Sequence, residues 1–364
     1  MAAMLPARAA MRMGVNTHFE QGWPLTALNK VQAAGADGIR DSVMWGKVEQ
    51  RPGVYDFSDN NSGFMNRICA RSIPVLVMVP PRNKLYDGGM LPASEAGRRA
   101  FANYIVALAA HFPCIVGVEI GNEINTPSRL WPAPPQKFPA YVALLKEVRR
   151  AIQAAGSRVA LVGGSSIGVD VPFHEHMFAA GELALVDAIA VHPYIDRPER
   201  LPEQIERLKQ AMAHHGATKP IWCTEFGNYY KTPEAAPPHA LKVMTIMSAA
   251  HVSRAYWYAL LDEPWFRNMG LYAGDAPKPA LATFRAVQQQ LLSAGDARRI
   301  DVGDPLSFIY RFGDGPYVMW GTSRSLRLPA GARAFDARGN RIDLPEALGP
   351  EPVIIDAPAG YRPG

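Results

Sequence analysis

Short apolar runs alternate with amphipathic segments from residue 12 to about residue 294. The run Ile73–Val79 has the length of a strand, and its nearly unbroken apolar character indicates a strand that is covered on both faces. Glu95–His111 instead carries apolar residues at helical spacing. We count eight such units, with strands predicted at Gly14–Phe19, Gly38–Val43, Ile73–Val79, Ile115–Gly121, Val159–Gly163, Ala188–His192, Pro220–Thr224 and Arg254–Tyr258.

Regular alternation of strands and helices predicts an α/β protein with a parallel sheet buried by helices. Eight units can close into a (β/α)8 TIM barrel, so we expect residues 12–294 to form one barrel domain. The competing architecture is an open doubly wound sheet, but no glycine-rich turn follows the first predicted strand. Residues 163–166 (GGSS) lack the lysine of a phosphate-binding loop, and we interpret them as a tight turn.

The pattern changes after residue 295 to short β-like runs separated by turns such as residues 313–315 (GDG). About seventy residues make only a marginal independent core. We therefore expect residues 295–364 to form a small antiparallel β module, similar to a sandwich, that packs on the barrel. Its predicted strands are Phe308–Phe312, Tyr317–Trp320, Leu326–Leu328, Ala334–Asp336 and Val353–Ile355.

Composition supports a folded globular chain, with 48% hydrophobic and 20% charged residues, and argues against disorder. No run of 18 apolar residues is present, so we expect no membrane span. The net charge is +5, but Lys and Arg are scattered and do not form a basic stripe, which argues against nucleic-acid binding. A mildly basic surface would also suit an acidic polysaccharide. The oligomeric state stays open.

The three cysteines, Cys69, Cys114 and Cys223, do not have metal-ligand spacing. Their odd number and core-like surroundings predict buried thiols and no disulfide framework. The first ten residues lack the apolar stretch of a secretory signal, although residues 7–9 (ARA) would fit the remnant of a trimmed one. Localisation stays open, with a periplasmic or secreted protein slightly favoured over a cytoplasmic one.

Polar residues that close an apolar strand of a barrel are candidates for the active site, because barrel enzymes use the carboxyl ends of their strands. The fourth run ends in Asn122 and Glu123, and the seventh ends in Glu225. The two glutamates should face each other across the barrel mouth. Such a pair suits cleavage of a glycosidic bond, in which one carboxyl group protonates the leaving oxygen and the other attacks or supports the positively charged anomeric centre. Direct attack requires about 5 to 5.5 Å between the carboxyl groups, and a water-mediated inverting route requires a wider gap.

This arrangement resembles clan A of the glycoside hydrolases over residues 12–294. The resemblance implies a retaining glycoside hydrolase with Glu123 as acid/base, Asn122 bound to the sugar 2-hydroxyl and Glu225 as nucleophile. Arg40, at the end of the second strand, matches an arginine that supports the nucleophile. A neighbouring guanidinium favours an ionised carboxylate.

Two further strand ends match the clan pattern. His192 and Tyr194 close the sixth strand, where the resemblance implies that the histidine touches substrate and the tyrosine bonds to the nucleophile. Trp257, at the end of the eighth strand, matches the tryptophan that forms the floor of the sugar subsite. Together with residues 45–58 (WGKVEQRPGVYDFS), the pattern is most similar to glycoside hydrolase family 39 and to hydrolases associated with bacterial exopolysaccharides.

Simpler structural interpretations remain open for several of these residues. Arg40 would also fit a core ion pair, and His192 a hydrogen-bonded core histidine. Glu119 competes with Glu123 for the acid role, but its place inside the strand indicates a buried, hydrogen-bonded carboxylate. His18, at the end of the first predicted strand, is equally consistent with packing and with substrate binding. Loop residues that should line the cleft are Asn83, Trp131, Tyr230, Asp262 and Trp265.

We expect no catalytic metal and no cofactor, since His174 and His176 have poor spacing for a shared ligand on one helical face. The expected partner is an oligo- or polysaccharide. Two alternatives remain within carbohydrate chemistry, a barrel that binds sugar without turnover and one that transfers the glycosyl group to another sugar. A third is an unrelated barrel enzyme that uses a metal or a phosphate substrate.

Overall fold

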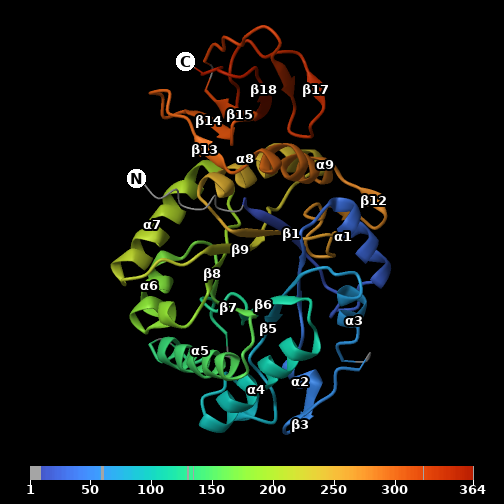
Figure 1. Cartoon of the computed structure of the whole chain (residues 1–364), viewed down its shortest axis with the longest axis vertical. Helices are drawn as coiled ribbons and strands as arrows, with labels where there is room; N and C mark the ends of the chain where they lie inside the picture. Colours follow the sequence, from blue (N-terminus) through green and yellow to red (C-terminus); the bar gives the residue numbers. More distant parts are fainter. Residues whose placement is uncertain (1–9, 59–60, 129–130, 134, 323, 364) are drawn as a thin grey trace.

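The structure is a computed structural model that describes residues 10–58, 61–128, 131–133, 135–322 and 324–363. A closed barrel of parallel strands, in the order β1-β10-β9-β8-β7-β6-β5-β2, occupies most of this part of the chain (Figure 1). The predicted (β/α)8 barrel is therefore confirmed. Its strands are β1 (Arg12–Asn16), β2 (Ile39–Ser42), β5 (Val75–Val79), β6 (Ile115–Ile120), β7 (Ala160–Ile167), β8 (Ala188–His192), β9 (Ile221–Phe226) and β10 (Arg254–Trp257).

Helices surround the barrel in Figure 1 and bury their apolar faces against the strands. In α7, for example, Leu201, Ile205, Leu208 and Met212 are buried at helical spacing. The helix α4 begins where the Ser94 hydroxyl accepts a hydrogen bond from the Gly97 amide at 3.0 Å, a typical N-cap. The helices are α1 (Leu28–Ala34), α2 (Trp45–Val48), α3 (Phe64–Cys69), α4 (Glu95–His111), α5 (Lys137–Ala154), α6 (Val171–Ala179), α7 (Leu201–His214), α8 (Ala236–Ala249) and α9 (Pro279–Ala286).

Short elements complete the connections between strands and helices. Two small antiparallel ribbons pair β3 (Glu49–Arg51) with β4 (Val54–Tyr55) and β11 (Tyr272–Ala273) with β12 (Ala276–Pro277). The single-turn helices are η1 (Leu25–Ala27), η2 (Asp87–Gly89), η3 (Glu182–Ala184), η4 (Pro198–Arg200), η5 (Pro233–Ala235) and η7 (Leu292–Ala294), and η6 (Val287–Leu291) is a π-helical turn that extends α9.

Most strands end within one or two residues of their predicted bounds, but β7 is longer than predicted. The interpretation of residues 163–166 as a tight turn is wrong, because these residues lie inside β7 at a register shift against β8. Gly164 and Ser165 have φ values of 85° and 33°, which let the chain form a bulge without leaving the sheet. The bulge directs the Ser165 hydroxyl to Glu119 in β6.

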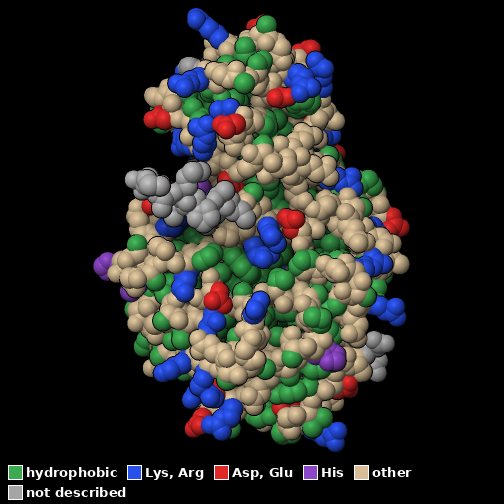
Figure 2. All heavy atoms as spheres, viewed as in Figure 1, with side chains coloured by type: hydrophobic (Ala, Val, Ile, Leu, Met, Phe, Trp, Pro, Cys, Tyr) green, Lys and Arg blue, Asp and Glu red, His purple; other side chains and the backbone are tan. Residues whose placement is uncertain are grey.

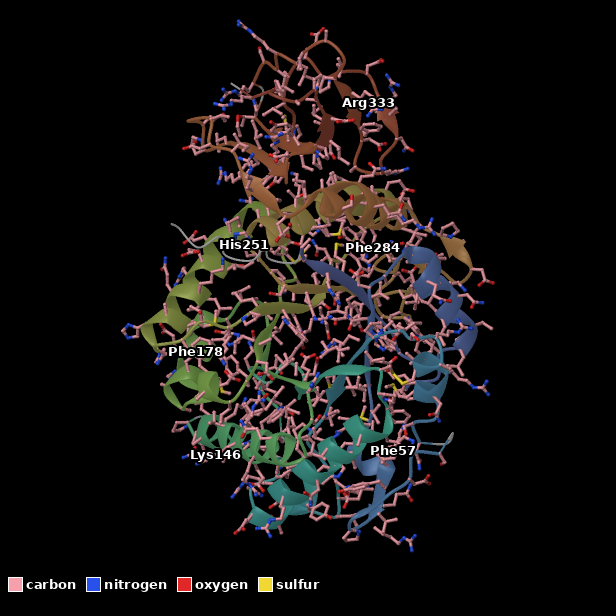
Figure 3. All side chains as sticks on the ribbon, in the orientation of Figure 1. Phe57, Lys146, Phe178, His251, Phe284 and Arg333 are labelled. Carbon is pink, nitrogen blue, oxygen red and sulfur yellow. A yellow bond between two sulfur atoms is a disulfide. The ribbon has the colours of Figure 1, made fainter. Side chains whose placement is uncertain are left out.

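The C-terminal strands form one six-stranded antiparallel sheet in the order β13-β14-β15-β18-β16-β17. It lies beyond α8 and α9 in Figure 1, and Arg333 marks its far side in Figure 3. The predicted strand at residues 326–328 is wrong, and two short strands at residues 297–299 and 341–342 were not predicted. The strands are β13 (Ala297–Arg299), β14 (Ser307–Phe312), β15 (Tyr317–Gly321), β16 (Arg333–Phe335), β17 (Arg341–Ile342) and β18 (Val353–Asp356).

The sheet is attached to the barrel helices through both polar and apolar contacts. The Trp320 indole donates to Glu199 at 2.9 Å, and the same carboxylate accepts from Lys242 of α8 at 3.1 Å. The fully buried Phe284 of α9 belongs to the same core cluster as Trp320 (Figure 3). These contacts suit a module that packs on the barrel, and we keep the division into residues 12–294 and 295–364 as a proposal.

The prediction of buried thiols without a disulfide is wrong for two of the three cysteines. Cys69 and Cys114 form a disulfide with a Cα–Cα distance of 5.0 Å, whereas Cys223 is free and buried. Cys69 ends α3 and Cys114 directly precedes β6, so both lie at the amino-terminal end of the barrel. An odd number of cysteines allows one bridge and one free thiol, and no spacing in the sequence indicates that Cys69 and Cys114 lie close together.

The described surface carries charges of both signs. Figure 2 shows Lys and Arg side chains scattered over the visible face among Asp and Glu, without a continuous basic stripe on that face. Among the described helices, none has the length and apolar character needed to cross a membrane.

Candidate active site

The carboxyl ends of the strands surround a cavity of about 380 Å³. Glu225 is the fifth of six residues in β9 and is 7% exposed, whereas Glu123 follows β6 with its side chain 25% exposed. One carboxylate oxygen of each lies within 4.8 Å of the other. The two glutamates therefore face each other across the cavity.

Arg40 of β2 lies beneath this pair and is almost completely buried. Its Nη1 donates to Glu225 Oε1 at 2.6 Å, and its Nε donates to Glu119 Oε2 at 2.6 Å. It also donates to Asn16 and Asn122, whose Oδ1 atoms lie 3.0 and 2.8 Å away. Burial disfavours the charge, but the two carboxylates more than offset this and raise the pKa of Arg40, so it stays a guanidinium cation.

His192 ends β8 and Tyr194 lies two residues beyond it. Tyr194 bonds to Glu225, and His192 bonds to Glu123. The Tyr194 hydroxyl donates to Glu225 Oε2 at 2.6 Å, while His192 Nδ1 lies 3.2 Å from Glu123 Oε1. Burial alone would lower the pKa of His192, but the charge of Glu225 and hydrogen bonds to Glu119 and Glu123 raise it to about 9. His192 is therefore protonated at neutral pH and donates to the Glu123 carboxyl group.

Glu225 is held in the ionised form that a nucleophile requires. Burial opposes its charge, but His192, Arg40 and the Tyr194 hydroxyl together lower its pKa. Both of its oxygens accept a hydrogen bond, which fixes the orientation of the carboxylate. The site thus combines a fixed carboxylate anion with a second, more exposed carboxyl group.

Glu119 is fully buried below the cavity, as predicted for a hydrogen-bonded carboxylate, and it does not line the cavity. Its Oε1 accepts from Ser165 at 2.7 Å and from Thr224 at 3.0 Å. Burial opposes its charge, but Arg40 and His192 lower its pKa to about 2. Glu119 is therefore ionised at neutral pH and, together with Glu225, balances the charges of Arg40 and His192, so it is not available as a proton donor.

The backbone at Glu123 has a conformation that only a well-packed loop can hold. Glu123 has φ = 45°, which is uncommon for a residue with a side chain. The loop is fixed by the Ser165 carbonyl, which accepts from the Ile124 amide at 3.0 Å, and by the Thr126 hydroxyl, which donates to the Glu123 carbonyl at 2.7 Å. In this conformation Glu123 lines the cavity.

Comparison with known proteins places this fold among glycoside hydrolases. No family model and no curated protein sequence matches the chain. A family 39 glycoside hydrolase from the gut symbiont Bacteroides cellulosilyticus WH2 aligns with a TM-score of 0.78 and 18% identity over 96% of this chain and 81% of that one. The chain has the fold of clan A glycoside hydrolases.

Two further clan A structures align over nearly the whole of both chains. The catalytic domain of xylanase C, a family 30 enzyme from Talaromyces cellulolyticus, has a TM-score of 0.66 at 14% identity over 97% of this chain and 98% of that one. A family 39 β-xylosidase from Caulobacter crescentus has a TM-score of 0.63 at 16% identity over the same shares. At these identities the likeness concerns the fold, and function must be argued from the site.

The structure brings most of the predicted clan A site residues together. Glu123, Glu225, Arg40, Asn122, Tyr194 and His18 all line the cavity. His18 packs against Trp23 with ring centroids 5.1 Å apart and the ring planes tilted by 36°. Burial lowers the pKa of His18, so its imidazole is neutral at neutral pH. His192 is fully buried and does not line the cavity, contrary to the expectation that it touches substrate. It contacts Glu123 instead.

Trp257 does not reach the cavity, contrary to the expectation that it forms the floor of the sugar subsite. It is 1% exposed, donates to the Met269 carbonyl at 2.8 Å and packs against Phe226. The next residue, Tyr258, lines the cavity instead. Successive side chains along a strand point to opposite sides, so an error of one residue exchanges a core position for a site position.

Several lining residues were not predicted from the sequence. They include Tyr258, Gln21, Tyr229 and Phe266, and their loops carry no motif beyond their aromatic and polar character. Of the predicted loop residues, Asn83 and Trp131 line neighbouring cavities. The other three line neither the catalytic cavity nor these two neighbours. Tyr230 is buried against His239, Asp262 pairs with Lys278, and Trp265 is exposed.

The described residues contain one cluster with the composition of a metal site, Glu123, His192 and Glu225. The protonation and hydrogen bonding of these three residues fit a proton-transfer network better than a metal site. His192 is protonated, and an imidazolium has no lone pair for a metal. Arg40 already supplies a cation 2.6 Å from Glu225. We therefore keep the absence of a catalytic metal as a prediction.

Proposed function

We propose that this protein is a retaining glycoside hydrolase that cleaves an O-glycosidic bond of an oligo- or polysaccharide by double displacement. The observation that carries the proposal is the Glu123–Glu225 pair, whose nearest oxygens lie no more than 4.8 Å apart. Retaining enzymes hold their two carboxyl groups about 5 to 5.5 Å apart, whereas inverting enzymes leave roughly 6.5 to 9.5 Å for a water molecule. The short separation favours direct attack by one carboxylate.

In the first step, a Glu225 oxygen attacks the anomeric carbon while the bond from that carbon to the leaving oxygen breaks. Glu123 transfers its proton to the leaving oxygen, which departs as an alcohol. The sugar is then held as a glycosyl ester of Glu225, and Glu123 is a carboxylate. Arg40 and Tyr194 keep Glu225 ionised and oriented for this attack.

In the second step, the Glu123 carboxylate takes a proton from a water molecule, whose oxygen attacks the anomeric carbon. The bond to Glu225 breaks, and the product keeps the original anomeric configuration. His192 fixes the position of Glu123 through its Nδ1 hydrogen bond in both steps. Transfer to a second sugar follows the same course with a sugar hydroxyl in place of water.

The remaining lining residues have roles that suit sugar recognition. Asn122 projects its amide from the residue before Glu123, and Arg40 holds its oxygen, which leaves the amide nitrogen free to face a sugar hydroxyl. The Tyr258 and His18 rings both line the cavity and contact each other edge to face, with centroids 5.5 Å apart. We assign Tyr258 the aromatic role first expected of Trp257. A barrel that only binds sugar would not need so complete a charge network.

The test is a screen of aryl glycosides, beginning with xylosides because two of the similar structures are a xylanase and a xylosidase, and of bacterial exopolysaccharides. Each substrate is incubated with wild type, Glu225→Gln and the matched variant Glu182→Gln, which alters a buried carboxyl group outside the cavity. We expect Glu225→Gln to lose at least about 1,000-fold in kcat and Glu182→Gln to stay within about threefold. Equal activity of Glu225→Gln and wild type would overturn the proposal.

Treatment with a chelator distinguishes the proposed mechanism from a metal-dependent one. We expect full activity after treatment with EDTA and dialysis, because every charge in the proposed mechanism is supplied by side chains. Activity that is lost on chelation and restored by a divalent cation would instead favour a metal bound by Glu123, His192 and Glu225.

A further inference from the structure

Two further cavities adjoin the catalytic cavity and are lined by residues that follow β6, β5 and β2. The second cavity, of about 240 Å³, shares Asn122 with the catalytic one. The third, of about 660 Å³, shares Pro80 and Arg82 with the second. The shared lining residues place the three cavities next to one another, in an order that leads away from the two glutamates.

The second cavity carries an aromatic side chain suited to a sugar ring. Trp131 lines it and packs against Gly121, where an added Cβ would lie 2.9 Å from the indole. Gly121 has φ = 80°, so the turn before Asn122 both requires glycine and leaves room for the ring. Tyr141 supports the indole edge to face, with centroids 6.1 Å apart.

The third cavity has an excess of positive charge. Lys47, Arg82 and Lys84 line it together with a single carboxylate, Glu20, so three cations face one anion and two positive charges remain. Lys47 is paired with Glu20 at 2.6 Å. Within the described part of the chain, Arg82 and Lys84 are exposed and have no ion-pair partner.

These two cations project from an anchored loop. Asn83, between them, is 4% exposed, donates to the Glu49 carbonyl at 2.8 Å and accepts from the Leu85 amide at 3.0 Å. The Glu49 carboxylate accepts from Tyr86 at 2.7 Å and from the Trp45 indole. The Trp45 and Tyr86 rings stack at 5.2 Å beneath the same cavity. The backbone of the loop is thus fixed while Arg82 and Lys84 stay free to bind an anion.

We infer that the substrate is an anionic oligo- or polysaccharide, whose chain extends past Trp131 and places a carboxylate or sulfate group between Arg82 and Lys84. This inference rests on the proposed function and names its substrate class. A neutral chain would leave both charges without a counter-ion, whereas an anionic group would form charge-assisted hydrogen bonds with each. Both residues lie away from the reacting carbon and act on binding along the cleft.

The test measures binding in the inactive Glu225→Gln background, so that turnover does not interfere. Arg82→Ala/Lys84→Ala is compared with the matched control Lys146→Ala/Arg158→Ala, which also removes one Lys and one Arg. Lys146 is exposed on α5 (Figure 3), and Arg158 is exposed before β7, at the opposite end of the barrel. The probes are oligosaccharides of polygalacturonate, unsulfated chondroitin and chondroitin sulfate, with xylohexaose as the neutral reference.

We expect at least one anionic probe to bind the parent more tightly than xylohexaose does, and its Kd to rise about fivefold to tenfold in Arg82→Ala/Lys84→Ala. The control variant should change Kd less than twofold. Raising NaCl from 20 to 200 mM should weaken anionic binding to the parent and affect the cavity variant less. Stronger binding of chondroitin sulfate than of chondroitin would identify sulfate as the preferred anion, and equal binding would identify carboxylate.

Two results would overturn the inference. One is that none of the anionic probes binds more tightly than xylohexaose, and the other is that the cavity variant and the control lose equal affinity, which would indicate general attraction to a basic protein. Unchanged thermal unfolding of each variant checks that the loop is intact. Failure of the proposed function has a different readout, namely turnover of aryl glycosides by Glu225→Gln in the absence of further substitutions.

Discussion

Replacement of Arg40 by methionine should destabilise the protein chiefly because it isolates Glu119. Arg40 is the shared cation between Glu119 and Glu225, with both contacts at 2.6 Å. Methionine fills much of the same volume without charge. The variant would leave a fully buried Glu119 carboxylate, with Ser165 and Thr224 as its hydroxyl donors and His192 as the remaining cation nearby, 3.7 Å away.

The size of the effect follows from burial and distance. Two unit charges about 4 Å apart interact by about 4 kcal/mol at an effective dielectric constant of about 20. Removal of one partner of a buried ion pair typically costs about 3 to 5 kcal/mol. We expect Arg40→Met to lower the free energy of unfolding by an amount in this range, which is a large share of the roughly 5 to 15 kcal/mol that stabilises an ordinary domain.

The assay is urea unfolding at pH 7 of wild type, Arg40→Met, Glu119→Gln and the double variant. If Glu119 needs Arg40 only as a counter-ion, then Glu119→Gln should restore part of the stability that Arg40→Met loses. The reason is that an unpaired buried amide costs about 1 to 3 kcal/mol, whereas an unpaired buried charge costs more. The double variant should be about 2 kcal/mol more stable than Arg40→Met. Additive losses, with no coupling between the two positions, would refute this account of the charge network.

Three further predictions concern Tyr194, His192 and the disulfide. Tyr194→Phe should lower kcat/KM about 10- to 100-fold and shift the acid limb of the pH profile to higher pH, because Glu225 loses a hydrogen bond that favours its ionised form. The control is Tyr230→Phe, which should keep full activity because the Tyr230 hydroxyl bonds to His239. The pKa of His192 is raised from 6.5 to about 9, so its contribution to stability is complete below about pH 6.5 and is lost as the pH rises through 9. The stability advantage of wild type over His192→Gln should therefore shrink by roughly 3 kcal/mol between pH 6 and pH 10, and a constant difference in urea unfolding would contradict the raised pKa. Cys69→Ala/Cys114→Ala should lose about 4 kcal/mol in the free energy of unfolding, since the bridge joins residues 45 apart; equal unfolding midpoints with and without the bridge would show that the unfolded chain is not constrained by it.

The alternation of apolar runs and helical patterns was sufficient to predict the barrel and the positions of Glu123 and Glu225. Glu225 lies next to the carboxyl end of β9 and Glu123 lies just beyond that of β6, and both strands are mostly apolar, so a carboxyl group at these positions stands out. Glu119 was also placed correctly as a buried carboxylate, because a charge inside such a strand has to be compensated.

Finer features depended on local geometry that the sequence pattern does not carry. Trp257 ends β10 and Tyr258 follows it, and the sequence pattern does not distinguish which of these adjacent aromatic residues faces the cavity. The bulge at Gly164 and Ser165 has the composition of a turn, but pairing with β8 continues beyond it. The Cys69–Cys114 bridge depends on how closely the end of α3 approaches the start of β6.

The most direct test of the central claim is the identification of the residue that carries the glycosyl group. A 2-deoxy-2-fluoro glycoside of the sugar found in the activity screen should inactivate the enzyme, and mass spectrometry of the digested protein should find the added mass on the peptide that contains Glu225. Glu225→Gln should take up no label. Label on Glu123, on Glu119 or on a residue outside the cavity would contradict the assignment of Glu225 as nucleophile.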